Sequence, residues 1–129
     1  MRRLLLIDDD EDYASIISMR LEKEGYQVKW ASSGDLAVQE LEKDFGYDVI
    51  ILDVEMPERN GLATLAHFRG HFNKRLGGFT IPVIVATGLM SPRLKEIFTG
   101  EQVSDYIQKP FETSMLVQKI ENILAQKKS

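Results

Sequence analysis

The sequence predicts an α/β protein built on a doubly wound, five-stranded parallel β-sheet, and three observations support this fold class. Short apolar runs alternate with longer amphipathic segments along the whole chain. Three of these runs are apolar at consecutive positions, as strands buried on both faces of a parallel sheet are: Leu4–Ile7, Val49–Leu52 and Val83–Ala86. Five runs alternate with five helical segments, an order that favours right-handed crossovers and helices on both faces of one sheet.

In the first half of the chain, each predicted strand precedes a helix with a recognisable end. After the first strand, apolar residues at helical spacing predict a helix over about Asp12–Glu24, which Gly25 should end. The second strand is Val28–Ala31. Ser33 follows it and is a suitable N-cap for a second helix, because its hydroxyl can accept a hydrogen bond from a free backbone N–H.

The same alternation continues in the second half of the chain. The remaining predicted elements are strand Val49–Leu52, a helix over 62–76, strand Pro82–Ala86, a helix that opens at Ser91-Pro92, strand Tyr106–Ile107, and a helix from about Met115 to the C-terminus. Ser91 is an N-cap residue, and Pro92 occupies the first helical position, where its missing N–H costs nothing.

Composition narrows the class of protein. The chain has 129 residues, a length typical of one domain, so we expect a single domain over residues 1–129. It has no cysteine, which excludes disulfides and thiolate metal sites and fits a cytoplasmic location. Its formal charge of −4 provides no excess of positive charge for direct nucleic-acid or membrane-surface binding. No apolar run approaches the length that spans a bilayer.

Five acidic residues in succession, Asp8–Asp12, follow the first predicted strand. Acidic side chains are common at helix N-termini, so this run alone is explained equally well as the solvated start of a helix. However, five neighbouring carboxylates repel one another, and their repulsion is relieved only when a cation is present or one of them keeps its proton. Oxygen ligands of this kind suit Mg²⁺.

A further carboxylate, Asp53, follows the strand Val49–Leu52. Alone it could be a turn residue. In a doubly wound sheet, however, the strands after the first and second helices flank the first strand, so Asp53 should lie beside Asp8 and Asp9. Three carboxylates then face one cleft, which predicts a site for a hard cation together with a nucleophile.

The last two strands end in a hydroxyl and an ammonium group. Thr87 and Lys109 each have an ordinary explanation, as a strand threonine and a surface lysine. Together with the acidic residues they can handle a phosphoryl group: a metal and a lysine neutralise its oxygens, a carboxylate attacks, and a hydroxyl donates.

Four stretches, LLLIDDDEDY, DVIILDVEMPERNG, PVIVATG and SDYIQKPF, occur in that order along the chain. With them the sequence resembles the receiver domain of two-component response regulators over essentially its whole length. The resemblance implies a flavodoxin-like (βα)₅ fold with strand order 2-1-3-4-5. It also implies a phosphoacceptor switch that catalyses only its own phosphorylation and dephosphorylation, not an enzyme with a separate substrate.

The resemblance assigns Asp53 to the phosphoacceptor position. It assigns Asp8 and Asp9 to the acidic pair that binds Mg²⁺ together with Asp53. The backbone carbonyl of Glu55 is the remaining protein ligand that it implies. The phosphoryl donor it implies is a phosphohistidine of a sensor histidine kinase or of a histidine phosphotransfer protein.

The other assigned residues concern the switch. Lys109 matches the lysine that pairs with a phosphoryl oxygen, and Pro110 the proline that follows a cis peptide bond. Thr87 matches the switch hydroxyl, and Tyr106 the aromatic residue whose ring turns inward. The face expected to bind an effector or a second copy combines the helix that opens at Ser91, the strand at Tyr106, and the C-terminal helix.

Two other classes of protein fit the sequence less well. A flavodoxin-like electron carrier would need to hold a flavin phosphate at the first strand-to-helix turn, and the acidic residues there would repel it. A small phosphatase of the haloacid dehalogenase type would use Asp8 and Asp10 of a D-x-D motif. That family carries Thr or Val where this chain has Asp12, and it usually needs cap elements for which 129 residues leave no room.

Overall fold

The computed structural model describes residues 2–44, 46–53, 81–88 and 104–127. The elements in these ranges are β1 (Arg3–Ile7), α1 (Glu11–Lys23), β2 (Gln27–Ala31), α2 (Gly34–Lys43), β3 (Val49–Asp53), β4 (Val83–Thr87), β5 (Asp105–Gln108) and α5 (Thr113–Lys127). All five predicted strands and three of the predicted helices are confirmed. The helices predicted over 62–76 and from Ser91 lie outside the described residues.

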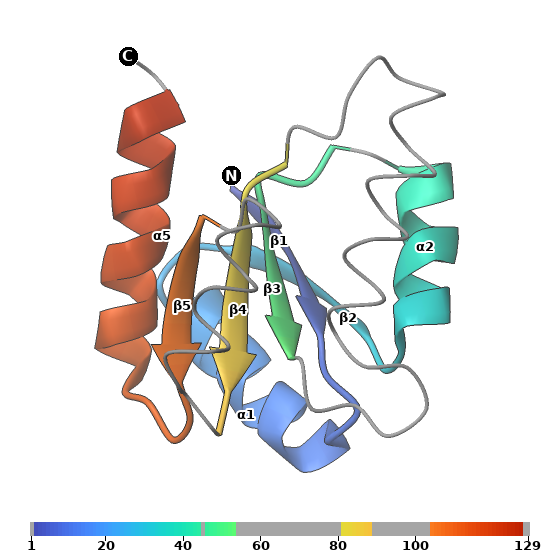
Figure 1. The fold of residues 1–129 in the computed structure, drawn as a ribbon, viewed down its shortest axis with the longest axis horizontal. Coiled ribbons are helices and arrows are strands. Elements are labelled where there is room, and N and C mark those ends of the chain that lie inside the picture. Colours follow the sequence, from blue (N-terminus) through green and yellow to red (C-terminus); the bar gives the residue numbers. More distant parts are fainter. Residues whose placement is uncertain (1, 45, 54–80, 89–103, 128–129) are drawn as a thin grey trace, which may run out of the picture.

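The strands form one parallel sheet in the order β2-β1-β3-β4-β5 (Figure 1). The predicted doubly wound, flavodoxin-like topology is therefore confirmed. Ile7 at the end of β1 pairs with Ala31 of β2 and with Leu52 of β3. Because all strands run the same way in this register, their carboxyl ends meet along one edge of the sheet.

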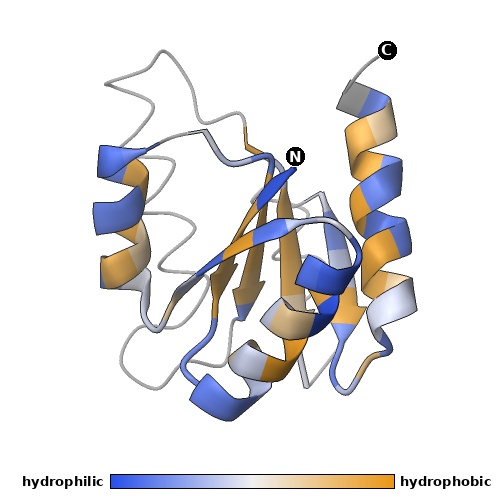
Figure 2. Ribbon diagram, turned by 180° about the vertical axis from the view of Figure 1, so that it is seen from behind, coloured by the Kyte–Doolittle hydropathy of each residue, from blue (hydrophilic) through white to orange (hydrophobic). Residues whose placement is uncertain are grey.

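Helices cover both faces of the sheet, which explains why its central strands are apolar at every position. Leu5 and Ile7 point to the face covered by α2, while Leu4 and Leu6 point to the face covered by α1 and α5. Every residue of β3 and β4 is buried. Figure 2 shows the resulting distribution, with hydrophobic residues concentrated in the central strands and both kinds of residue on the helices.

The helix ends follow the local sequence. Asp10 caps α1, since its carboxylate accepts a hydrogen bond from the Tyr13 N–H, and the helix is followed by Gly25 with a φ of 96°. Ser33 caps α2 by accepting from the Leu36 N–H. Both predicted end signals, Gly25 and Ser33, are confirmed.

Among the described residues, no helix combines the length and the apolar character that crossing a membrane requires.

Candidate functional site

The carboxyl edge of the sheet carries the buried polar side chains of the described part of the chain. Asp8, Asp53 and Thr87 are 1%, 4% and 1% exposed, and they are the buried polar or charged residues among those that the structure describes. Asp8 directly follows β1, while Asp53 and Thr87 end β3 and β4. Burying a carboxylate is costly unless it is paired, so this concentration of polar groups requires a local source of positive charge.

Lys109 supplies that charge from the loop after β5. Its Nζ lies 2.9 Å from Oδ2 of Asp8 and 3.3 Å from Oδ2 of Asp53. Burial opposes the charged form of the amine, but the hydrogen bond to Asp8 and the charge of Asp53 outweigh it, so the pKa of Lys109 is raised. The Lys109–Pro110 peptide bond is cis, as expected.

Three carboxylates converge as the sequence predicts. Asp8, Asp9 and Asp53 each offer an oxygen atom, and these atoms lie within 4.8 Å of one another. Two of the groups are buried and Asp9 is exposed, so the cluster opens to solvent on one side. Lys109 offsets only one of the three negative charges, and the donor set consists of oxygen alone. The described residues therefore fit a hard divalent cation such as Mg²⁺. Glu55 lies outside the described residues.

Asp10 does not share this arrangement. Its carboxylate is exposed and caps α1 through the Tyr13 N–H, while its own N–H donates to Oδ1 of Asp8. A phosphatase of the D-x-D type would need this second aspartate in the cleft. The structure instead gives Asp10 a capping role.

The residues assigned to the switch lie close by in the sheet. Thr87 is buried at the end of β4, and its carbonyl accepts a hydrogen bond from the Lys109 N–H at 2.8 Å. Tyr106 is half-buried in β5, where it pairs with Val85 of β4. The backbone of Lys109 is thus attached to β4, while its side chain contacts the carboxylates.

Two aromatic residues, Trp30 and Tyr13, contact the site although the sequence pattern does not assign them to it. Trp30 donates its indole N–H to the backbone carbonyl of Asp8 at 2.7 Å. Tyr13 lies beneath Lys109, with Nζ 4.4 Å from the ring centroid. The sequence signal that could have pointed to them is their position along the chain. Tyr13 follows the acidic run, and Trp30 lies near the end of the neighbouring strand.

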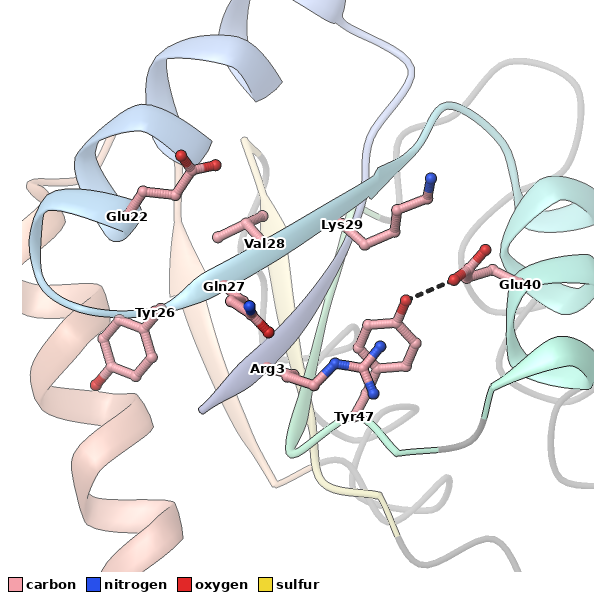
Figure 3. A pocket seen from close by; sticks show the side chains of 8 residues that line it. All are labelled: Arg3, Glu22, Tyr26, Gln27, Val28, Lys29, Glu40 and Tyr47. Atoms are coloured by element: carbon pink, nitrogen blue, oxygen red, sulfur yellow. Dashed lines mark hydrogen bonds between the residues drawn. The ribbon is translucent and has the colours of Figure 1, made fainter. Parts of the chain in front are cut away.

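A hollow of about 540 Å³ lies elsewhere, over the edge strand β2 (Figure 3). Two of its charged residues, Arg3 and Glu40, are already bonded to neighbouring groups. Arg3 lies 2.6 Å from Asp44 and stacks on the ring of Tyr47, and the Tyr47 hydroxyl donates to Glu40 at 2.7 Å. Because Arg3 begins β1, this hollow lies toward the amino ends of the strands, away from the acidic cluster at their carboxyl ends. We therefore do not assign phosphoryl or metal chemistry to it.

The fold and the site together define a class: flavodoxin-like α/β proteins with an acidic, lysine-paired cluster at the carboxyl ends of the strands. The chain matches the family model of the response regulator receiver domain over residues 4–121. It therefore belongs to this family, whose members are phosphoacceptor switches of two-component signalling.

Individual relatives agree with this assignment. The transcriptional regulatory protein CpxR of Escherichia coli (strain K12) is 35% identical over 124 residues, which are 96% of this chain and 50% of that protein. The chain thus spans about half the length of the curated regulators it matches. Neither the family model nor this relative supports a small phosphatase of the haloacid dehalogenase type.

Solved structures give the same result. The chemotaxis protein CheY4 of Vibrio cholerae superposes with a TM-score of 0.84 at 26% identity, covering 95% of this chain and 98% of that one. A putative response regulator of Chloroflexus aurantiacus superposes with a TM-score of 0.83 at 32% identity, covering 96% and 98%.

Adding MgCl₂ should raise the free energy of unfolding, because the cation binds the clustered carboxylates of the folded chain better than the unfolded chain. At ten times the dissociation constant the gain is about 1.4 kcal/mol, measurable by urea titration. Asp9→Asn should remove most of this gain without unfolding the chain, since Asp9 is exposed. An equal gain from NaCl of the same ionic strength, or a full gain in Asp9→Asn, would contradict the assignment.

Lys109→Met should destabilise the metal-free chain by about 3 kcal/mol, because it leaves two buried carboxylates without their cation. MgCl₂ should recover more stability in this variant than in the wild type, since it replaces the lost positive charge. Lys119→Met is the matched control. Lys119 pairs with the less buried Asp105 at 3.2 Å, so its loss should cost less than about 1 kcal/mol. Equal costs for the two substitutions would refute this account of the site.

Proposed function

We propose that this receiver accepts a phosphoryl group on the Asp53 carboxylate, from a phosphohistidine of a sensor histidine kinase or of a histidine phosphotransfer protein. The observation that carries the proposal is the position of Asp53: a buried carboxylate at a strand end, 3.3 Å from the Lys109 ammonium and clustered with Asp8 and Asp9. A cytoplasmic location, typical of receiver domains, is part of this proposal.

The contacts of Asp8 support Asp53 as the acceptor. Oδ1 of Asp8 accepts from the Asp10 N–H at 3.0 Å, and Oδ2 accepts from Lys109 at 2.9 Å. Asp8 therefore orients the lysine, and it can share the cation with Asp9. Asp53 lies at the end of the adjacent central strand β3, beside the same ammonium.

In the proposed transfer, an oxygen of Asp53 forms a bond to phosphorus while the P–N bond to the donor imidazole breaks, and its electron pair returns to the imidazole. Lys109 neutralises charge on the phosphoryl oxygens. When held by Asp8, Asp9, Asp53 and the Glu55 carbonyl, Mg²⁺ would supply further neutralisation of the same oxygens. Hydrolysis of the acyl phosphate restores the carboxylate, and we propose that the chain catalyses no other reaction.

The output of the switch is also a proposal. Phosphorylation replaces one negative charge on Asp53 by a larger group of about two negative charges. The Thr87 hydroxyl would then move toward the new oxygens, and the Tyr106 ring would fill the vacated space. The face that includes β5 and α5 would repack and bind an effector or a second copy of the chain.

Incubation with Mg²⁺ and acetyl phosphate tests the acceptor directly. Intact mass should rise by one phosphoryl group, about 80 Da, and chelation of the metal should prevent the rise. Asp53→Asn should abolish it, because the amide cannot form the acyl phosphate. Asp10→Asn is the matched control and should still be phosphorylated, since Asp10 caps α1. Uptake of phosphate by Asp53→Asn at the wild-type rate would refute the proposal.

A further inference from the structure

Tyr13 contacts both the ammonium group of Lys109 and the loop after β5 that carries Lys109. It lies half-buried in the first turn of α1, and its ring faces Nζ of Lys109 at 4.4 Å from the centroid. The ring of Phe111, two residues after Lys109, packs against it edge-to-face, with centroids 5.9 Å apart and planes at 89°. One ring on α1 thereby holds the loop after β5 at two points.

Lys109 needs such a support because of its own chemistry. A lysine side chain is a flexible four-carbon stem, and the ammonium it carries is strongly hydrated. The side chain of Lys109 remains 18% exposed, so water competes with its carboxylate partners. An aromatic face attracts an ammonium group and also occupies the space into which the group would swing.

The contact belongs to the ring of Tyr13 and not to its hydroxyl. The hydroxyl oxygen is buried, and among the residues that the structure describes it has no hydrogen-bond partner. A hydroxyl that acted on the site would need a partner there. Phenylalanine should therefore replace tyrosine without loss at this position, whereas an aliphatic residue should not.

We propose that Tyr13 is a positioning residue of this receiver: its ring face holds the Lys109 ammonium against Asp8 and Asp53, where it meets the incoming phosphoryl group. The role toward the incoming phosphoryl group rests on the proposed function. The contact that holds Lys109 against Asp8 and Asp53 concerns the unphosphorylated chain alone.

The first test is therefore made without metal or phosphoryl donor. Protons above an aromatic ring resonate upfield, so the ε-methylene signal of Lys109, assigned by its absence from Lys109→Met, should stand apart from the other lysines in an NMR spectrum of ¹³C-lysine-labelled chain. Tyr13→Leu should move this signal to the ordinary range, and Tyr13→Phe should keep it displaced. A Lys109 signal unaffected by Tyr13→Leu would overturn the proposal.

The second test measures the rate of phosphorylation by acetyl phosphate at saturating Mg²⁺. Tyr13→Leu should lower the rate about three- to tenfold, and Tyr13→Phe should stay within about twofold of the wild type. In a Lys109→Met background, Tyr13→Leu should have no further effect, because Tyr13 acts through Lys109. Equal losses in the Phe and Leu variants, or an undiminished effect without Lys109, would refute the inference.

Mg²⁺ affinity provides the control for folding in the same samples. Tyr13 contributes no carboxylate to the cluster. The Mg²⁺ dissociation constants of the wild type, Tyr13→Phe and Tyr13→Leu should therefore lie within about threefold of one another. The two proposals also fail separately. If the wild-type chain takes up no phosphoryl group on Asp53, the proposed function falls, while the NMR comparison still decides whether Tyr13 holds Lys109.

Discussion

The sharing of one ammonium group by two buried carboxylates is the interaction on which the rest of the structure depends. Asp8 directly follows β1, Asp53 ends the adjacent strand β3, and both contact the same Nζ of Lys109. Carboxylates this close ionise together only with positive charge nearby. The sheet order brings β1 and β3 together, and the loop after β5 returns the lysine to them. With Asp9, the site keeps an excess of negative charge. This excess favours binding of a cation, and a charged group added to Asp53 would change the balance of charge around Lys109.

The same interaction connects the acidic site to the last strand and helix. The side chain of Lys109 contacts the two carboxylates, its N–H bonds to the Thr87 carbonyl, and its loop joins β5 to α5. A change of charge on Asp53 therefore acts on a residue attached both to β4 and to the start of α5. This route requires no contact beyond those seen at the carboxyl edge, and it gives the proposed switch a physical connection to the face formed by β5 and α5.

Much of the fold was predictable because its central strands are buried on both faces and so read as unbroken apolar runs. The proximity of Asp8, Asp9 and Asp53 followed from strand adjacency in a doubly wound sheet, and the resemblance to receivers supplied the strand order. The support of Lys109 by Tyr13, and of the Asp8 carbonyl by Trp30, was not predictable, because it depends on side-chain directions across loops and not on periodicity. The ligand role of Glu55 and the helices over 62–76 and from Ser91 stay predictions.

The most direct test of the central claim is a crystal structure of the chain with Mg²⁺ and beryllium fluoride, which mimics a phosphoryl group on a carboxylate. The proposed site predicts beryllium bonded to an oxygen of Asp53, the metal ion held by the carboxylates of the cluster, and the Lys109 ammonium in contact with a fluorine atom. Beryllium bonded to Asp8 or Asp10, or a metal ion away from Asp8, Asp9 and Asp53, would contradict it.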